Sequence, residues 1–223
     1  MKKYTIIILF LFLILIFINL NTFKENFTSL NTIPKIIYLC YKTKNIPDYI
    51  IPTWKRLNPD YEIRLFDNND CREFLRKNYD KKHLEVFDFL RDGPIKADFW
   101  RCCIIYKYGG VYCDIDVKPL KPINSFLEND TDFLTVRSGE EKHRLTPELI
   151  ISKPKNELLK MCIDNYLKWK LENVKYEYWK YSITRIMSTN MEKLIPEKKK
   201  KQNKNVYFVN NKKYQIVNEI RNK

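Results

Sequence analysis

Two aspartates one residue apart, Asp114 and Asp116, follow a short apolar run near the middle of the chain. In an extended chain, residues i and i+2 point to the same side, so both carboxylates are expected to face one point. Carboxylate oxygens are the ligands that hard divalent cations such as Mg²⁺ and Mn²⁺ take. The pair therefore predicts a cation site, and a cation held there would bridge two phosphates of a nucleotide.

A predicted helix, Ile95 to Tyr108, leads directly to this carboxylate pair. Its apolar residues recur at steps of three and four, which is typical of a helix packed on a core. The chain holds only four glycines, and two of them, Gly109 and Gly110, stand together at the expected end of this helix. Asp98 and Arg101 lie three residues apart and are therefore neighbours on its surface. Arg101 is expected to donate hydrogen bonds to a ligand, and Asp98 to accept them from sugar hydroxyls.

The rest of the chain reads as alternating strands and helices. A continuous apolar run at residues 36–41 predicts a strand buried on both faces, as in a parallel sheet. We predict further strands at 61–66, 111–113, 132–136, 148–152 and 206–209, and helices at 48–57, 70–78, 82–90, 156–171 and 179–188. Such a β-α-β-α opening implies an α/β fold with a mostly parallel sheet and right-handed crossovers. Ligands of these sheets bind outside the carboxyl ends of the strands, where the two aspartates are expected.

The first residues differ in composition from the rest. Two lysines precede an uncharged apolar run from Tyr4 to Leu20, which at about 1.5 Å per residue reaches the short end of a membrane span. We predict one retained transmembrane helix, a signal anchor with a short cytoplasmic end, because no small-x-small cleavage site follows. The predicted domains are the anchor at 1–21, a stem at 22–32, a catalytic domain at 33–190 and a basic segment at 191–223. In this single-pass topology the catalytic domain is lumenal, in a secretory compartment, or extracytoplasmic.

Charge and cysteine usage narrow the class of protein. The formal net charge is +14, and residues 191–223 carry ten Lys/Arg and three Asp/Glu, or +7. Such a charge run is typical of a solvated tail, although it also suits an anionic membrane surface or a phosphorylated ligand. Nucleic acid is not an expected partner. The six cysteines form no CxxC pair, so no zinc site is predicted. Most are expected to be small buried hydrophobes. One disulfide is an alternative if the domain is lumenal.

The central residues resemble a known enzyme family. The pattern is Ala97-Asp98-x-x-Arg101 followed by Tyr106-x-Tyr108-Gly109-Gly110-x-Tyr112-x-Asp114-x-Asp116. It is similar to the DXD-motif sugar transferases, glycosyltransferase family 32, and the likeness extends from about Ile33 to Leu167. The resemblance implies a GT-A-type fold, a nucleotide-sugar donor such as GDP-mannose or a UDP-sugar, and Mn²⁺ or Mg²⁺ as cofactor. It also implies transfer of a hexose to a glycan or glycoconjugate acceptor with retention of configuration.

The same resemblance gives five residues a role. Asp98 and Arg101 would contact the donor sugar, and Tyr112 would lie near the donor. Asp114 would contact the ribose or the sugar, and Asp116 would hold the metal ion, with Asp114 beside it. Asp114 and Asp116 are therefore the expected catalytic residues, acting on an oxocarbenium-like transition state by analogy with glycoside hydrolysis.

The chain departs from the family pattern, and two alternatives stay open. Tyr38 stands where the family's first strand often carries a His-containing motif. Many relatives have a His and a Trp near the C-terminus, whereas the only histidines here are His83 and His143. One alternative is a haloacid-dehalogenase-type phosphatase, disfavoured because that fold begins with its DxD strand and here two predicted strands come first. The other is a catalytically weak, membrane-anchored protein that binds glycans or polyanions.

Overall fold

A computed structural model describes residues 12, 14–16, 32–139, 144–195 and 205–218. The chain divides into two units, Met1–Thr32 and Ile33–Lys223, and the sheet and helices named below all belong to the second. The predicted membrane anchor at residues 1–21 lies mostly outside the described residues. Within the part of the chain that the structure describes, none of the helices has both the length and the apolar character needed to cross a membrane.

A seven-stranded mixed sheet runs through the domain in the order β2-β1-β3-β5-β4-β7-β6. The strands are β1 Ile36–Cys40, β2 Glu62–Phe66, β3 Gly110–Asp114, β4 Thr131–Arg137, β5 Leu145–Ser152, β6 Val206–Val209 and β7 Lys212–Asn218. β2, β1 and β3 are parallel, β5 runs antiparallel between β3 and β4, and β7 is parallel to β4. Only β5 and β6 are reversed among these strands, so the predicted α/β fold with a mostly parallel sheet is confirmed.

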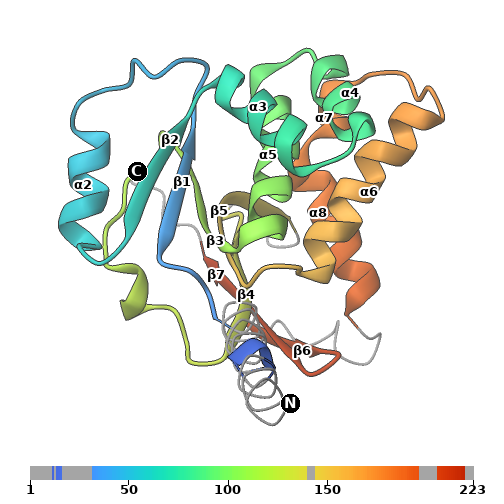
Figure 1. Cartoon of the computed structure of the whole chain (residues 1–223). Helices are drawn as coiled ribbons and strands as arrows, with labels where there is room; N and C mark the ends of the chain where they lie inside the picture. The colour runs from blue at the N-terminus through green and yellow to red at the C-terminus, as the bar shows by residue number, and fades with distance from the viewer. Residues whose placement is uncertain (1–11, 13, 17–31, 140–143, 196–204, 219–223) are drawn as a thin grey trace, which may run out of the picture. The chain divides into compact units, whose positions relative to one another are not determined.

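Helices cover both faces of the sheet (Figure 1). They are α2 Ile50–Leu57, α3 Asn68–Asn78, α4 Lys81–Phe89, α5 Gly93–Tyr108, the 3₁₀ turn η1 Ile123–Ser125, α6 Glu157–Leu171, α7 Tyr178–Tyr181 and α8 Ile183–Leu194. One core includes Trp54 of α2 and η1, and the larger core on the other face gathers α3 to α6 and α8. The fold is therefore three layers, with α5 on the larger side against the sheet.

Helix α5 is buried on nearly all sides, which the apolar spacing alone did not predict. Besides its apolar residues, Asp98 and Arg101 are 7% and 4% exposed. The reason is that α5 packs against α3, α4, α6 and α8 as well as β3 and β5. Two charged side chains are thus held inside the domain, and a buried charge of this kind needs a partner.

Three local expectations are corrected by the structure. Helix α2 begins at Ile50, two residues later than predicted, and no side chain caps it. Asp70 is not the first residue of α3 but closes a capping box with Asp67. The helix predicted at 179–188 is two helices, α7 and α8, separated at Ser182.

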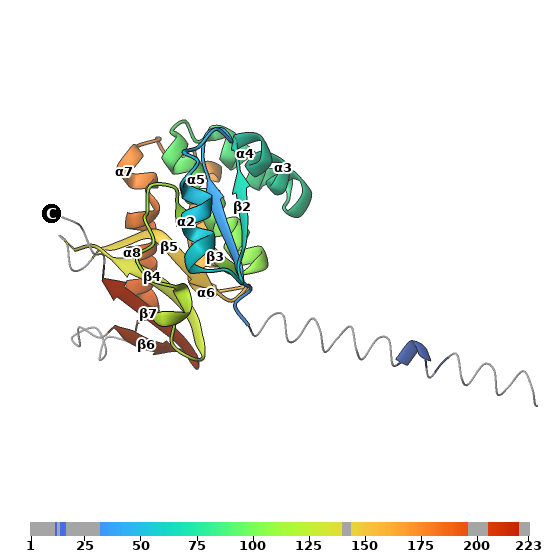
Figure 2. The ribbon, with the colours of Figure 1, turned by 90° about the vertical axis from the view of Figure 1, so that its left-hand side faces the viewer.

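The expected solvated tail is wrong for its last described part. Residues 212–218 form β7, which pairs with β4 over Thr131 to Arg137 inside the sheet. Tyr214 of β7 is fully buried, and Gln215 is 5% exposed. The sheet therefore continues past residue 190, and β6 forms its far edge, at the opposite end from β2 (Figure 2). This strand was not predicted because its first two residues are lysines in a basic segment, although an alternating Tyr-Gln-Ile segment follows them.

Two glycines join α5 to β3 without a loop. Gly109 caps the helix with φ 68°, and Gly110 starts the strand with φ 100°, a region that other residues avoid. A Cβ on Gly110 would lie 2.9 Å from the Ile36 carbonyl oxygen of β1, and one on Gly109 would lie 2.8 Å from the Ser152 carbonyl oxygen of β5. Glycine is therefore required by conformation and by space, and the predicted C-cap is confirmed.

Candidate active site

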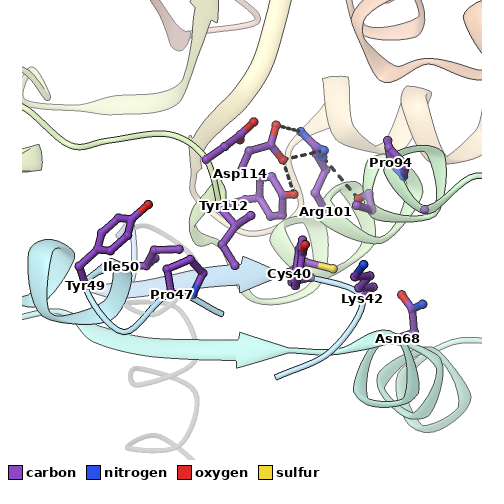
Figure 3. A pocket seen from close by; sticks show the side chains of 15 residues that line it. Cys40, Lys42, Pro47, Tyr49, Ile50, Asn68, Pro94, Arg101, Tyr112 and Asp114 are labelled. Carbon is purple, nitrogen blue, oxygen red and sulfur yellow. Dashed lines mark hydrogen bonds and ion pairs between the residues drawn. The ribbon is translucent and has the colours of Figure 1, made fainter. Parts of the chain in front are cut away.

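A pocket of about 560 Å³ opens at the carboxyl ends of β1 and β3 (Figure 3). From β1 the chain passes to β2 on one side and later to β3 on the other, so the strand order reverses here. Open α/β sheets bind ligands at such a point because no crossover covers it. Four of the five predicted site residues line this pocket. They are Tyr112, Asp114 and Asp116, at the end of β3 and just beyond it, and Arg101 of α5.

Arg101 connects the elements that meet at the pocket floor. Its Nη2 atom lies 2.9 Å from the Asp98 Oδ1 atom and 2.9 Å from the Asp114 Oδ1 atom. Its Nη1 atom donates to the Pro147 carbonyl oxygen of β5 at 2.6 Å, and its guanidinium lies 4.3 Å from the centre of the Tyr112 ring. One side chain thus links α5, β3 and β5, and the fork geometry of arginine suits this role.

Asp114 is held from within the protein. Besides its ion pair with Arg101, it accepts a hydrogen bond of 2.6 Å from the Tyr112 hydroxyl group. Its side chain is 31% exposed, whereas the Tyr112 side chain is fully buried. Asp114 therefore presents one edge to the pocket from a fixed position.

Asp98 does not line the pocket, because both of its oxygens are used inside the protein. Its Oδ1 atom pairs with Arg101, and its Oδ2 atom accepts a hydrogen bond of 3.0 Å from the backbone N–H of Ile183. Ile183 is the first residue of α8, so Asp98 ties this helix to α5. In this structure Asp98 positions Arg101, and the contact with a donor sugar that the family resemblance implies stays a prediction.

Burial and charge oppose each other in this cluster. Burial raises the pKa of Asp98 to about 6, although the positive charge of Arg101 acts in the other direction. Burial also disfavours the Arg101 charge, but the carboxylates of Asp114 and Asp98 outweigh it and hold its pKa well above its usual value. The guanidinium therefore stays positive at the pocket floor.

Asp116 is placed differently from Asp114, contrary to the extended geometry assumed for the pair. The strand ends at Asp114, and a turn follows in which the Val117 N–H donates to the Asp114 carbonyl oxygen at 3.2 Å. Asp116 is exposed at the pocket wall and makes no hydrogen bond or ion pair with another described residue. The turn, not strand alternation, brings both carboxylates to one pocket.

The chemistry of these two carboxylates fits a divalent cation in part. No cluster of three or more His, Cys, Asp or Glu side chains suited to a metal ion occurs among the described residues. Asp116 offers free oxygens, while those of Asp114 are shared with Arg101 and Tyr112. A cation held by Asp116 would thus need oxygens from a ligand or from water, which is usual for Mg²⁺ at phosphates.

The remaining wall of the pocket was not predicted from the sequence. It is formed by Cys40, Tyr41, Lys42, Pro47, Tyr49, Ile50 and Asn68 at the ends of β1 and β2, and by Gly93, Pro94, Ala97 and Ile115. The residues from Cys40 to Ile50 and Asn68 lie at or after the ends of the first two strands, where an α/β sheet places its ligand. Of the others, Ala97 belongs to the family pattern, whereas Gly93, Pro94 and Ile115 carry no motif.

Comparison with known proteins identifies the region around the pocket. Residues 47–133 match the family model described as a glycosyltransferase sugar-binding region containing a DXD motif. This part of the chain is similar to the sugar-binding region of the DXD-motif glycosyltransferases. The predicted resemblance to this family is thereby confirmed over these residues.

Three curated relatives are named as mannosyltransferases or as a mannosyl-lipid synthase. Inositol phosphoceramide mannosyltransferase 3 of Schizosaccharomyces pombe is 40% identical over 88 residues, 38% of this chain and 24% of that protein. Mannosyl phosphorylinositol ceramide synthase SUR1 of Saccharomyces cerevisiae is 35% identical over 104 residues, which are 42% of this chain and 26% of that protein. Inositol phosphoceramide mannosyltransferase 1 of S. pombe is 27% identical over 146 residues, which are 63% of this chain and 44% of that protein. The chain thus matches about a quarter of the length of the first two.

A solved structure extends the likeness to the fold. The PaToxG glycosyltransferase superposes with a TM-score of 0.59 over 79% of this chain and 76% of its own, at 15% sequence identity. This identity is low, so the match concerns the arrangement of the chain alone. It supports the prediction of a glycosyltransferase-type α/β fold.

Proposed function

We propose that this protein transfers a hexose from a nucleotide-sugar donor to a glycan or glycolipid acceptor, in a reaction that depends on Mn²⁺ or Mg²⁺ and retains the anomeric configuration. The observation that carries the proposal is the pairing of a fixed carboxylate, Asp114, with an open one, Asp116, in one pocket. A membrane-anchored, lumenal or extracytoplasmic location is part of the proposal and rests on the apolar run at residues 4–20.

Asp116 is the residue we assign to the metal ion. It is exposed at the pocket wall and has no competing partner among the described residues. When bound, the cation would neutralise negative charge on the departing nucleoside diphosphate. The formal charge of the diphosphate makes this the largest electrostatic demand on the site.

Asp114 and Arg101 are assigned to orientation of the donor. Asp114 keeps one edge toward the pocket while Arg101 and Tyr112 fix the other, so it can accept hydrogen bonds from ribose or sugar hydroxyls. Arg101 adds positive charge at the pocket floor, which favours an anionic diphosphate in this pocket. These groups are in place before the donor arrives, which removes the cost of arranging them during the reaction.

Retention is consistent with the carboxylates that the pocket offers. Among the described residues that line it, Asp114 and Asp116 are the only acidic ones. Asp114 is bound to Arg101, and we assign Asp116 to the cation, so neither is free to form a covalent glycosyl intermediate. We therefore propose that the acceptor attacks on the face from which the diphosphate leaves.

Mannose is the sugar we propose first, and GDP-mannose the donor. The support is that the relatives reported above are named for mannosyl transfer. Those names also specify an inositol phosphoceramide acceptor, which makes a glycolipid the first acceptor class to test. A UDP-sugar as donor and a glycan as acceptor are the second combination to test.

The test measures nucleoside diphosphate release from GDP-mannose and from a set of UDP-sugars, with and without Mn²⁺ or Mg²⁺. We expect turnover of one donor that stops when the cation is chelated. Asp116→Asn should lower it by roughly 10²–10³-fold, the usual cost of one electrostatic contact to developing charge. Asp164→Asn is the matched control, because Asp164 is an exposed carboxylate of α6 that pairs with Lys160 outside the pocket.

Two results would contradict the proposal. One is full activity of the Asp116→Asn variant with an unchanged dependence on the cation. The other is binding of heparin or a glycan without turnover of any donor, which would favour a binding protein over an enzyme. Thermal unfolding of both variants shows whether a loss of activity reflects the site or the fold.

A further inference from the structure

Two cysteines from separate elements face one another beside the pocket. The Sγ atom of Cys40, at the end of β1, lies 3.5 Å from the Sγ atom of Cys71 in α3. This contact joins residues 31 positions apart in the sequence. The sulfurs of a disulfide lie about 2 Å apart, so the two thiols have to approach each other by about 1.5 Å to form a bond.

The two thiols differ in their access to solvent. Cys71 is 1% exposed, whereas Cys40 is only partly buried and lines the pocket (Figure 3). Cys40 also stands opposite Asp114 in the parallel pairing of β1 and β3. A reagent that enters the pocket can therefore reach one member of the pair, and the second member lies directly behind it.

We propose that Cys40 and Cys71 form an internal disulfide in oxidising surroundings, and that this bond ties α3 to the end of β1 at the pocket wall. The oxidant belongs to the class of small disulfides such as oxidised glutathione. This modification site is independent of the proposed transferase activity. It requires only the sulfur contact and the open path to Cys40.

The reaction balances as two thiol–disulfide exchanges. The Cys40 thiolate attacks one sulfur of oxidised glutathione, which breaks that disulfide and releases one glutathione thiolate. The Cys71 thiolate then attacks the Cys40 sulfur and releases the second glutathione, so two protein thiols are oxidised and two glutathiones are formed. Burial raises the pKa of the Cys71 thiol, which lowers the fraction of thiolate available for the second step.

A second sulfur pair in the same domain provides the matched control. The thiols of Cys102 in α5 and Cys162 in α6 also interact through a hydrogen bond. Both residues are fully buried, between helices and away from the pocket wall. This pair has the same chemistry as Cys40 and Cys71 but no path for the oxidant.

The experiment uses the full chain, first reduced and then incubated while folded with oxidised glutathione. Free thiols are alkylated, and trypsin fragments are analysed by mass spectrometry. We expect a linked pair of fragments 36–42 and 65–72, which carry Cys40 and Cys71 and no other cysteine. Fragments 102–107 and 161–168, which report on the buried pair, should stay unlinked.

Three outcomes would overturn the proposal. They are a Cys40 that stays permanently joined to glutathione, a Cys40 that does not react, and linkage of both cysteine pairs at the same rate. The Cys71→Ser variant should stop at the glutathione-bound Cys40, because the second thiol is absent.

Thermal unfolding tests whether the bond fits the native fold. A cross-link that closes a loop of this length should raise the Tm of the oxidised protein by roughly 5–10 °C. A reductant should reverse the shift, and the Cys71→Ser variant should show none. A linked form whose Tm is not raised would overturn the claim that the bond ties α3 to β1 in its native position.

Discussion

Strands β1 and β3 are parallel neighbours that differ in their chemistry. Tyr38 pairs with Tyr112 and Cys40 with Asp114. The central residues of both strands are buried, and both strands end at the pocket. The Tyr112 hydroxyl donates to Asp114, whereas the Tyr38 hydroxyl has no hydrogen-bond partner among the described residues. Of the two strands, only β3 is paired with a buried positive side chain from a helix, Arg101 of α5.

The difference shows what turns a strand end into a candidate active site. Both strands provide the same backbone geometry at the same edge of the sheet. The site arises on β3 because α5 enters it through two glycines, with no intervening loop, and carries Arg101 to Asp114. A carboxylate at the end of β3 is thus fixed by its helix, while β1 contributes the wall.

The largest expected effect breaks the buried charge cluster that distinguishes β3. Arg101→Met leaves Asp98 and Asp114 without their cation, and removal of one partner from a buried ion pair costs about 3–5 kcal/mol. Arg72→Ala is the control, since Arg72 makes an exposed two-point ion pair with Asp88, whose loss should change the free energy of unfolding little or not at all. Urea denaturation measures both. Equal losses in the two variants would show that burial adds nothing to the Arg101 cluster.

The next prediction concerns the pH dependence that this cluster imposes. Because the pKa of Asp98 is about 6 in the folded protein and its ordinary value is 3.8, the folded state holds a proton that the unfolded state has lost. The raised pKa of Asp98 contributes on the order of 3 kcal/mol to the free energy of unfolding. This contribution is complete below pH 4 and is lost as the pH rises through 6. Asp98→Asn removes this titration.

Urea denaturation of the wild type and of Asp98→Asn between pH 4 and 7.5 measures this contribution. The difference between the two curves cancels the exposed carboxylates, whose pKa values are lowered by their partners, such as that of Glu73 beside Arg76. Parallel curves across the whole range would contradict the raised pKa of Asp98.

A third effect concerns the close approach of β3 to β1. Gly110→Ala forces a side chain into a positive φ and against the Ile36 carbonyl oxygen of β1, which should cost about 1–3 kcal/mol. Gly93→Ala at the start of α5 is the control, because no atom lies within 4 Å of its added Cβ and no positive φ is required. We expect it to be neutral or stabilising by up to about 1 kcal/mol. Similar losses of Tm in both variants would contradict the role assigned to Gly110.

Much of this β1–β3 arrangement is predictable from the sequence, because it rests on local signals. Apolar runs, helix periodicity and a glycine pair place β1, α5 and the start of β3, and they bring Asp98, Arg101 and Asp114 to one end of the sheet. The family motif adds the resemblance to the DXD-motif glycosyltransferases. These features depend on neighbours a few residues apart, which a single sequence records.

What the sequence does not predict depends on distant contacts. The Ile183 N–H that occupies Asp98 comes from a helix 85 positions away, and the Pro147 carbonyl that anchors Arg101 from a strand 46 positions away. The turn at Asp116 replaces the expected strand because pairing of β3 ends at Asp114. Strand β7 was missed because its lysines look like a solvated tail until β4 is placed beside it.

The smallest effect tests the two tyrosines that face one another across β1 and β3. Tyr112→Phe removes a short hydrogen bond to Asp114, and we expect a loss of about 1 kcal/mol because Arg101 still holds the carboxylate. Tyr38→Phe removes a buried hydroxyl that has no partner among the described residues, so this variant should be as stable as the wild type or slightly more stable. The comparison is well matched, since the two residues are paired in register and both are buried. If Tyr38→Phe costs as much as Tyr112→Phe, the Tyr38 hydroxyl has a bound water or ligand as its partner, and β1 contributes more than a wall.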